Sequence, residues 1–180
     1  MLRESEEVLG GIPGFALAIS KGILAPNAGI DRSNVPHGYA ILYPQNPKRT
    51  VDQLRAYLER NSKTDIQGPL RLGVLLSDSR ITPTRMGTIG IAIAASGFKP
   101  VIDFRGKKDL FGNELKVTLK AVADQLSSAA QLVMGEARES TPVVIIRGYN
   151  ADMDEEGSPS MTIDHEKCLY IQGLKNRFES

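Results

Sequence analysis

The sequence predicts an α+β fold in which a mixed sheet packs against helices and carries long loops. Apolar runs of strand length alternate irregularly with amphipathic segments, and stretches rich in Gly and Pro separate them. No internal repeat is visible along the chain. A chain of 180 residues is long enough to bury one sizeable core, so we expect a single domain.

The composition is that of an ordinary soluble globular protein. Hydrophobic residues make up 41% of the chain, and 22 Lys and Arg nearly balance 21 Asp and Glu, for a formal net charge of +1. This charge supplies no general field that would attract nucleic acid or an anionic membrane. Cys168 is the single cysteine, so neither an intrachain disulfide nor a thiolate metal site can form. Because no apolar run approaches the ~20 residues of a membrane span and the acidic N-terminus does not resemble a secretory signal, we expect a cytoplasmic protein without nucleic-acid or membrane partners.

The first part of the chain is predicted to hold a short helix, a hairpin and a long loop. Residues 2–9 have the short apolar edge of a helix end, and the glycines that follow would terminate it. Residues 15–19 and 23–25 are apolar runs around a Ser-Lys-Gly turn, which indicates a hairpin. Residues 26–38 are turn-rich and are expected to form a loop that leads into a strand at residues 39–43.

The middle of the chain is predicted to contain a strand between two helices. Residues 50–53 fit a capping box, in which the Thr50 hydroxyl accepts from a backbone N–H and Gln53 reaches back to the cap. Residues 70–76 have the pattern of a strand that ends in a Ser-Asp-Ser-Arg sequence. Residues 89–95 are apolar and rich in small side chains, which favours a packed helix.

The last part of the chain is predicted to contain a long helix between strands. A short strand is expected at residues 101–104. Apolar side chains recur every three or four residues over 115–133, which predicts an amphipathic helix, and Gly135 is placed to end it. Residues 142–146 are uniformly apolar and predict a fully buried strand. A final strand is expected at residues 168–171, after an acidic loop.

The sequence lacks the two common glycine-rich nucleotide loops. Neither a Gly-x-x-x-x-Gly-Lys-Ser/Thr loop nor a Gly-x-Gly-x-x-Gly turn is present, so a P-loop or Rossmann site has no backbone cradle. Instead, Asp31 and Asp78 are expected in loops beside strands, and Ser79 adds a hydroxyl. Mg²⁺ is commonly held by one or two carboxylates together with substrate phosphates, so these residues could form a phosphate-bridging metal site. Alternatively, the two carboxylates hydrogen-bond to their own turns.

Glu136 is a further candidate ligand because it follows a predicted helix C-terminus. That end carries partial negative charge, which a nearby cation would offset, although exposed loop acids are also commonly just solvated. Three arginines, Arg80, Arg85 and Arg105, could clamp a phosphate or carboxylate or could be ordinary surface residues. The two histidines and the cysteine lack partners at the spacing of a metal or catalytic motif, so they receive no role.

Several segments in a fixed order carry a family likeness. They are AGIDRSNVP at 28–36, SDS at 77–79, DLFGNELKVT at 109–118, AVAD at 121–124 and VIIRG at 144–148. Each segment is weak alone, but the ordered set resembles the coenzyme F420-0:L-glutamate ligase (gamma-glutamyl ligase) family. The resemblance implies an F420 ligase-like core at residues 1–148, completed by a C-terminal loop and strand at residues 149–180.

The activity that this resemblance implies is GTP-dependent amide formation. Members of the family activate the carboxylate of a deazaflavin coenzyme precursor through an acyl-phosphate-type intermediate, which the amino group of L-glutamate attacks. The implied cofactors are Mg²⁺ or Mn²⁺, with K⁺ as a further ion and GTP as co-substrate. The implied assembly is a homodimer.

The resemblance also implies site residues. Asp31, Asp78, Ser79 (where the family more often has Thr) and Glu136 match metal ligands, and Asn34 matches a guanine-nucleotide contact. The stretch that matches a GTP-wrapping segment comprises Met134, Gly135, Glu136, Ala137, Arg138, Glu139, Ser140 and Thr141. No catalytic residue is assigned.

The chain also departs from the family pattern. It is expected to lack an N-terminal segment that supplies further GTP contacts, and residues 80–87 contain no Trp where the family has a Gly-Arg-Pro-Trp-Arg-like run. The sequence is therefore compatible with two functions. One is the GTP- and metal-dependent ligase, and the other is a truncated or degenerate non-catalytic paralogue that acts as a binding or assembly protein.

Overall fold

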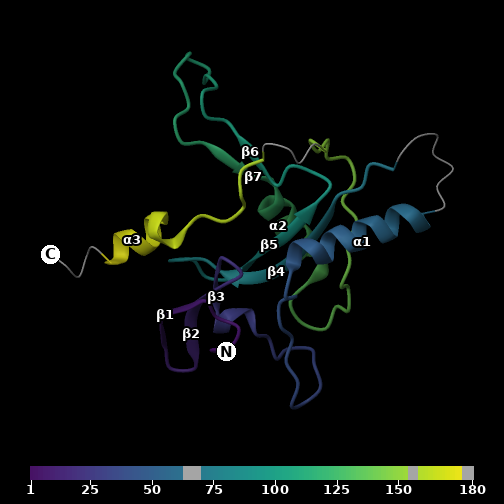
Figure 1. Ribbon diagram of the computed structural model, residues 1–180, viewed down its shortest axis with the longest axis vertical. Helices are drawn as coiled ribbons and strands as arrows, with labels where there is room; N and C mark the ends of the chain where they lie inside the picture. The colour runs from purple at the N-terminus through teal and green to yellow at the C-terminus, as the bar shows by residue number, and fades with distance from the viewer. Residues whose placement is uncertain (63–69, 154–157, 176–180) are drawn as a thin grey trace.

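The computed structural model describes residues 1–62, 70–153 and 158–175, and its architecture is α+β as predicted (Figure 1). The strands form three small antiparallel sheets, with the orders β1-β2-β3, β4-β5 and β6-β7. They are β1 (Glu7–Ile12), β2 (Phe15–Ser20), β3 (Ile23–Pro26), β4 (Val74–Ile81), β5 (Thr88–Ser96), β6 (Val101–Asp103) and β7 (Leu119–Ala121). The helices are α1 (Pro47–Asn61), α2 (Val122–Met134) and α3 (Leu169–Lys175), with short 3₁₀ turns η1 (Asn27–Gly29) and η2 (His165–Lys167). No helix within these ranges has the length and apolar character that crossing a membrane requires.

The antiparallel pair of β4 and β5 forms the centre of the fold, and other elements pack on both of its faces. Between the partners of Leu76 and Ser77, strand β5 carries one extra residue, Ile93, which makes a β-bulge. The bulge changes which side chains of β5 share a face. Ala92 and Ala95 belong to the core under α2, whereas Ile93 packs with β3 on the other side.

Helix α2 crosses β5 at close range. A Cβ atom at Gly90 would lie 2.4 Å from the Ser127 carbonyl oxygen, so a residue without a side chain is needed here. The Ser128 hydroxyl donates to the Gly90 carbonyl at 2.8 Å, and the Asp124 carboxylate accepts from the Ala92 N–H at 2.9 Å. These contacts fix the position of α2 on the sheet.

Residues 89–95 form most of β5, so the prediction of a packed helix there is wrong. The strand is covered on both faces, and most of its side chains are buried. A fully buried strand has no alternation of apolar and polar residues, and its sequence does not distinguish it from a buried helix. The small residues that suggest helix packing instead make room for α2.

The opposite face of the central pair is covered by α1 and by the N-terminal sheet. Val51 of α1 packs against Val74 of β4 and Ala94 of β5. Ile23 of β3 packs against Ile91 and the bulge residue of β5. The central pair is therefore enclosed between α2 on one side and α1 with β3 on the other.

Helix α1 begins earlier than the capping box at residues 50–53 predicts. Asn46 is the N-cap: its Oδ1 accepts from the Arg49 backbone N–H at 2.9 Å, and Pro47 occupies the first helical position. Thr50 lies inside the helix, and its hydroxyl donates to the Asn46 carbonyl at 3.0 Å. The stronger sequence signal is Asn followed by Pro, because Pro at the first helical position loses no helical hydrogen bond.

The predicted hairpin at residues 15–25 is confirmed as β2 and β3. The helix predicted at residues 2–9 is wrong, because from Glu7 the chain pairs with β2 and forms β1. Pairing with a strand edge here overrides a weak local helical pattern. The strand predicted at residues 39–43 is reduced to a single bridge, which joins Ile41 to Asp31.

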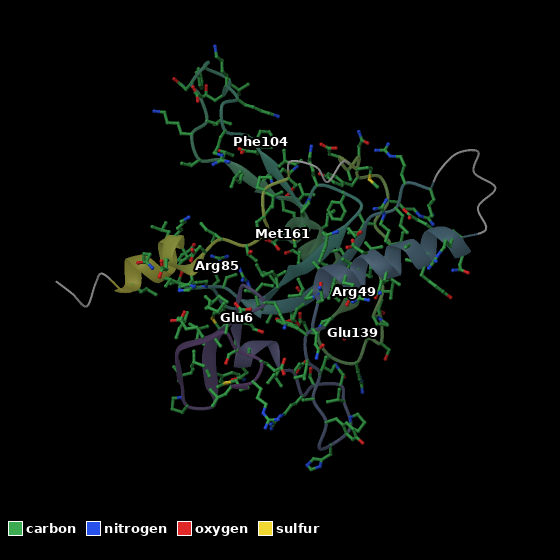
Figure 2. The ribbon with its side chains drawn as sticks, viewed as in Figure 1. Glu6, Arg49, Arg85, Phe104, Glu139 and Met161 are labelled. Carbon is green, nitrogen blue, oxygen red and sulfur yellow. The ribbon has the colours of Figure 1, made fainter. Side chains whose placement is uncertain are left out.

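Strands β6 and β7 carry a hairpin arm, residues 104–118, that projects from the body of the protein (Figure 1). Figure 2 shows Phe104 near the base of this arm. At its tip, the Asp109 carboxylate accepts from the Phe111 backbone N–H at 2.9 Å. The ordered tip presents Leu110 and Phe111, which are 100% and 90% exposed.

The helix predicted over residues 115–133 is correct only in its second part. That part is α2, which ends at Gly135 (φ +76°) as expected. The first part is not helical, and β7 within it pairs with β6. Because the apolar residues of β7 continue the helical spacing of α2, periodicity alone places the helix start too early.

Two strands predicted in the C-terminal part are wrong. Residues 142–146 form no strand, and Val143 and Ile145 are 77% and 75% exposed. Residues 169–171 belong to α3, so a helix stands where a strand is predicted. Both predictions rest on short apolar runs, which do not by themselves establish burial or a pairing partner.

Two described stretches after position 149, residues 151–153 and 158–161, return to the core under α2. The Lys99 N–H donates to the Asp152 carbonyl at 2.7 Å, and the Ser158 hydroxyl donates to the Val101 carbonyl at 3.0 Å. Met161 packs against the core cluster and lies near the centre of the molecule in Figure 2. This stretch therefore contributes directly to the core that positions α2.

We expect Gly90→Ala to destabilise the fold, because the new Cβ would overlap with the backbone of α2. The expected loss in the free energy of unfolding is about 1–3 kcal/mol, measured by urea denaturation. Gly173→Ala is the matched control, since a Cβ at Gly173 in α3 meets nothing within 4 Å. Equal stability of the two variants would contradict the close contact.

Candidate functional site

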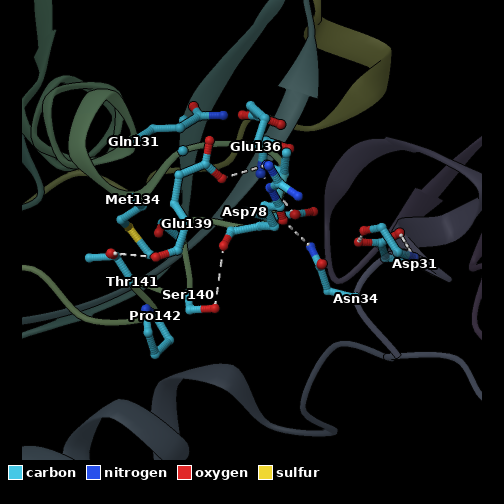
Figure 3. Close-up of a pocket in the computed structure, with 17 residues that line it drawn as sticks. Asp31, Asn34, Asp78, Gln131, Met134, Glu136, Glu139, Ser140, Thr141 and Pro142 are labelled. Atoms are coloured by element: carbon cyan, nitrogen blue, oxygen red, sulfur yellow. Dashed lines mark hydrogen bonds between the residues drawn. The ribbon is translucent and has the colours of Figure 1, made fainter. Parts of the chain in front are cut away.

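A pocket of about 590 Å³ gathers polar residues from three distant segments. It lies between the loop at residues 31–34, adjacent positions of β4 and β5, and the end of α2 with the segment that follows (Figure 3). All residues to which the family resemblance gives a binding role line it: Asp31, Asn34, Asp78, Ser79, Met134, Gly135, Glu136, Ala137, Arg138, Glu139, Ser140 and Thr141. The lining is completed by Ser33, Ser77, Gly90, Gln131 and Pro142.

Asp78 lies inside β4 and not in a loop beside a strand as predicted. Pairing with β5 continues past it to Ile81, so the polar sequence at 77–80 does not end the strand. Its Oδ2 accepts from the Tyr43 hydroxyl at 2.6 Å, and its Oδ1 accepts from the Ser79 backbone N–H at 2.8 Å. These donors allow a charged residue to occupy the middle of a strand. Burial and the adjacent Asp78 carboxylate raise the pKa of Tyr43, so the phenol stays protonated and remains a donor.

Asp31 is held by its own turn, which is one of the two alternatives that the sequence leaves open. Its Oδ1 accepts from the Ser33 backbone N–H at 2.8 Å, and its Oδ2 accepts from the Ser33 hydroxyl. Partial burial raises the pKa of Asp31, but hydrogen bonds from Ser33 and the Arg32 backbone outweigh it and hold the pKa below its usual value. The carboxylate is therefore ionised at neutral pH and adds negative charge to the pocket.

A hydrogen bond links the loop at residues 31–34 to the segment after α2. Asn34 Nδ2 donates to the Ala137 carbonyl at 2.8 Å and so joins residues 103 positions apart in the sequence. Asn34 has a φ of +51°, in the left-handed region that Asn occupies more readily than most residues. The amide that the family likeness assigns to a nucleotide thus binds the protein's own backbone in this structure.

The segment after α2 folds back on itself to form a wall of the pocket. Gly135 ends the helix with a φ of +76°, and the Glu139 side chain lies against it. The Glu139 carboxylate accepts from the Ala137 N–H at 2.8 Å, which closes a tight turn. Glu136 is exposed at this turn and lines the pocket.

The pocket is acidic. Its lining includes four carboxylates, on Asp31, Asp78, Glu136 and Glu139, against the single guanidinium of Arg138. Such a lining repels phosphates and carboxylates unless cations are bound with them. The side-chain atoms of the lining that could ligate a metal are mostly oxygens, which are the ligands that Mg²⁺ and Mn²⁺ prefer.

The lining fits a metal ion that shares its coordination with a ligand. Within the ranges that the structure describes, no three His, Cys, Asp or Glu side chains come close enough together to hold an ion by themselves. Mg²⁺ usually takes only one or two carboxylates and completes its shell with water and substrate phosphates. Asp78 and Asp31, whose carboxylates are fixed by hydrogen bonds, suit this mode of binding.

Tyr43 is the residue near the site that sequence analysis missed. It belongs to no motif and lies 35 positions from Asp78 in the sequence, so no local signal connects the two. The three arginines considered as anion clamps, Arg80, Arg85 and Arg105, are absent from the lining of the pocket. Arg105 instead pairs with its neighbour Asp103 at the start of the hairpin arm, at 2.5 Å.

Fold and site together define an α+β protein with an acidic, oxygen-lined pocket built from three segments of one chain. Residues 1–148 match the family described as F420-0:Gamma-glutamyl ligase, and the chain belongs to this family.

Relatives of the chain carry the name coenzyme F420:L-glutamate ligase. The protein of Methanopyrus kandleri is 41% identical over 160 residues, which cover 88% of this chain and 61% of the relative. That of Methanocaldococcus jannaschii is 44% identical over 151 residues, covering 83% and 58%. That of Haloarcula marismortui is 35% identical over 176 residues, covering 97% and 65%. The matches thus span about three fifths of the length of these curated relatives.

We expect Asn34→Asp to loosen the segment after α2 without unfolding the protein. Asp retains the size of Asn and its tolerance of a positive φ, but the carboxylate cannot donate to the Ala137 carbonyl. Loss of this bond corresponds to roughly 2- to 10-fold faster amide hydrogen exchange over residues 137–141. The control is Asn61→Asp, which removes a donor to the Tyr57 carbonyl within α1. Unchanged exchange over residues 137–141 in Asn34→Asp would show that the bond does not order this wall.

The stability of the protein should fall at acid pH as Asp31 becomes protonated. Because the folded-state pKa of Asp31 is lowered, its ionised carboxylate contributes stability above the unfolded pKa of about 3.9, and this contribution is lost as the pH falls through the folded pKa. Ser33→Ala removes the hydroxyl donor and should raise the pKa of Asp31 toward its usual value. The pKa is measured by NMR titration of the side-chain carboxyl carbon, with Ser5→Ala as a control far from the pocket in sequence. A pKa of Asp31 that is the same in both variants would exclude the hydroxyl as a cause.

Proposed function

We propose that the chain acts in the GTP- and divalent-metal-dependent ligation of L-glutamate to the carboxylate of a coenzyme F420 precursor. The observation that carries this proposal is the gathering of all the residues that match the family's metal and nucleotide positions around one acidic pocket. Membership of the F420-0:Gamma-glutamyl ligase family supports the reaction class. The names of the relatives support glutamate as the amino donor.

The proposed reaction has two steps. First, a carboxylate oxygen of the acceptor attacks the γ-phosphorus of GTP, GDP leaves, and an acyl phosphate forms. Then the amino group of L-glutamate attacks the acyl carbon, inorganic phosphate leaves, and the nitrogen loses a proton as the amide forms. The first step joins two anionic reactants, so a site that catalyses it has to offset their mutual repulsion.

Different residues of the pocket would hold the metal ion and surround the phosphates. A bound Mg²⁺ or Mn²⁺ neutralises phosphate charge and orients the reacting groups. Asp78 and Asp31 would hold such an ion, because their carboxylates are already oriented by hydrogen bonds, and Glu136 and Ser79 are further candidate ligands. The segment at residues 134–141 would surround the phosphates.

The proposal includes a deazaflavin coenzyme precursor as acceptor, a homodimer as the assembly and K⁺ as a further ion, all of which the family likeness implies. Large apolar side chains on the surface support an assembly, because exposed apolar groups are often covered by a partner. Leu110 and Phe111 at the tip of the hairpin arm are the most exposed examples on that arm.

The first test is thermal unfolding of the chain with GTP and Mn²⁺. A ligand that binds only the folded state at 100 times its dissociation constant adds about 2.7 kcal/mol, or roughly 5–10 °C in Tm for a chain of this size. We expect this shift with GTP and Mn²⁺ together, and a smaller one with ATP and Mn²⁺ or with Mn²⁺ alone. Asp78→Asn should abolish it, whereas Asp164→Asn, the same change outside the pocket lining, should retain it.

Ligation itself is tested with the coenzyme precursor, L-glutamate and GTP, and the readout is the amide product with release of GDP and phosphate. A Tm shift together with product supports the ligase. A Tm shift without product favours the non-catalytic paralogue that the sequence leaves open. The absence of any shift, or an equal shift in Asp78→Asn, contradicts the proposed nucleotide and metal site.

A further inference from the structure

Tyr43 touches the site from outside the pocket. Its hydroxyl donates to Asp78 Oδ2 at 2.6 Å, and this bond is partly buried. The residue is not part of the pocket lining, whereas Asp78 is. Any effect of Tyr43 on a bound ligand would therefore act through Asp78.

The ring of Tyr43 is held on two sides. On one side it packs against the apolar cluster of Ile23, Ile91 and Ile93, which joins β3 to β5. On the other it lies against Gly29, where a Cβ atom would be 2.2 Å from the Tyr43 Cζ. Gly29 also has a φ of +72°, a conformation that disfavours other residues. The position of the phenol oxygen is therefore set by packing, independently of any ligand.

The two oxygens of Asp78 are held by different donors. Oδ2 is held by the Tyr43 hydroxyl, and Oδ1 by the Ser79 backbone N–H. Two donors on two oxygens fix the orientation of the carboxylate plane. Each carboxylate oxygen has two lone pairs and keeps the capacity to bind a cation as well.

We propose that Tyr43 is a positioning residue that orients the Asp78 carboxylate for a divalent cation in the pocket. The inference rests on the proposed function, because it takes Asp78 to be a metal ligand. Partners that orient a metal ligand typically change metal affinity by 10- to 100-fold when they are removed. A residue that only fills space would have no such effect, since Tyr43→Phe keeps the ring and removes only the oxygen.

The test is Mn²⁺ binding to the whole chain, with and without GTP. Binding is measured by the electron paramagnetic resonance signal of the free ion. We expect Tyr43→Phe to raise the dissociation constant about 10- to 100-fold. Tyr57→Phe, the same change on the exposed face of α1, should bind Mn²⁺ like the wild type. Asp78→Asn should bind much more weakly, and adding Tyr43→Phe to it should cause no further loss, because the two residues act through one carboxylate.

The outcomes separate this inference from the proposed function. If the wild type binds Mn²⁺, Asp78→Asn does not, and Tyr43→Phe binds like the wild type, the positioning role is overturned while the metal site stands. If the wild type binds no Mn²⁺ with or without GTP, both are overturned. An additive loss in the double variant also overturns the positioning role, because Tyr43 would then act independently of Asp78.

A measurement on the wild type covers the case in which Tyr43→Phe fails to fold. The chain contains five tyrosines and no tryptophan, so its near-ultraviolet absorbance reports mainly on tyrosine. Titration with Mg²⁺ should perturb this absorbance, because a cation on Asp78 weakens the hydrogen bond that the carboxylate accepts from Tyr43. The perturbation should vanish in Asp78→Asn. Mg²⁺ binding without any change in tyrosine absorbance would overturn the inference.

Discussion

The contact between α2 and β5 at Gly90 determines where the pocket forms. With no side chain at this position, the helix backbone reaches the strand, and Asp124 and Ser128 bond directly to the backbone of β5. The helix then ends at Gly135, so the segment that forms one wall starts at a defined place relative to β4 and β5. A larger residue at position 90 would move this wall as well as the helix.

Most of the carboxylates that line the pocket have hydrogen-bond donors of their own. Asp31 is held by Ser33 within its turn, Asp78 by Tyr43 and its neighbouring amide, and Glu139 by the Ala137 amide. Hydrogen bonds to the charged form stabilise an ionised group, which offsets part of the repulsion between acids in one site. The protein thus holds negative charge in fixed positions before any ligand arrives, which is the arrangement that electrostatic preorganisation requires.

The α+β class and the hairpin of β2 and β3 could be predicted from residue patterns, and much of the lining of the pocket could be predicted through the family likeness. Three of the errors, at residues 89–95, 142–146 and 168–171, share a physical cause, which is that short apolar runs do not show what covers them. Residues 89–95 are a strand because α2 and β3 bury both of its faces, whereas most of the equally apolar residues 142–146 stay exposed. Tyr43 could not be found from the sequence either, because its role depends on a contact made only by the folded chain.

The Asn34 side-chain amide is already engaged within the protein, because it donates to the Ala137 carbonyl. A ligand that uses the same Asn34 N–H would have to displace the Ala137 carbonyl, so one hydrogen bond would be exchanged for another and the net gain in affinity from that contact would be small. The exchange also releases the backbone of the adjoining wall. Binding through that N–H and movement of the wall would then be coupled.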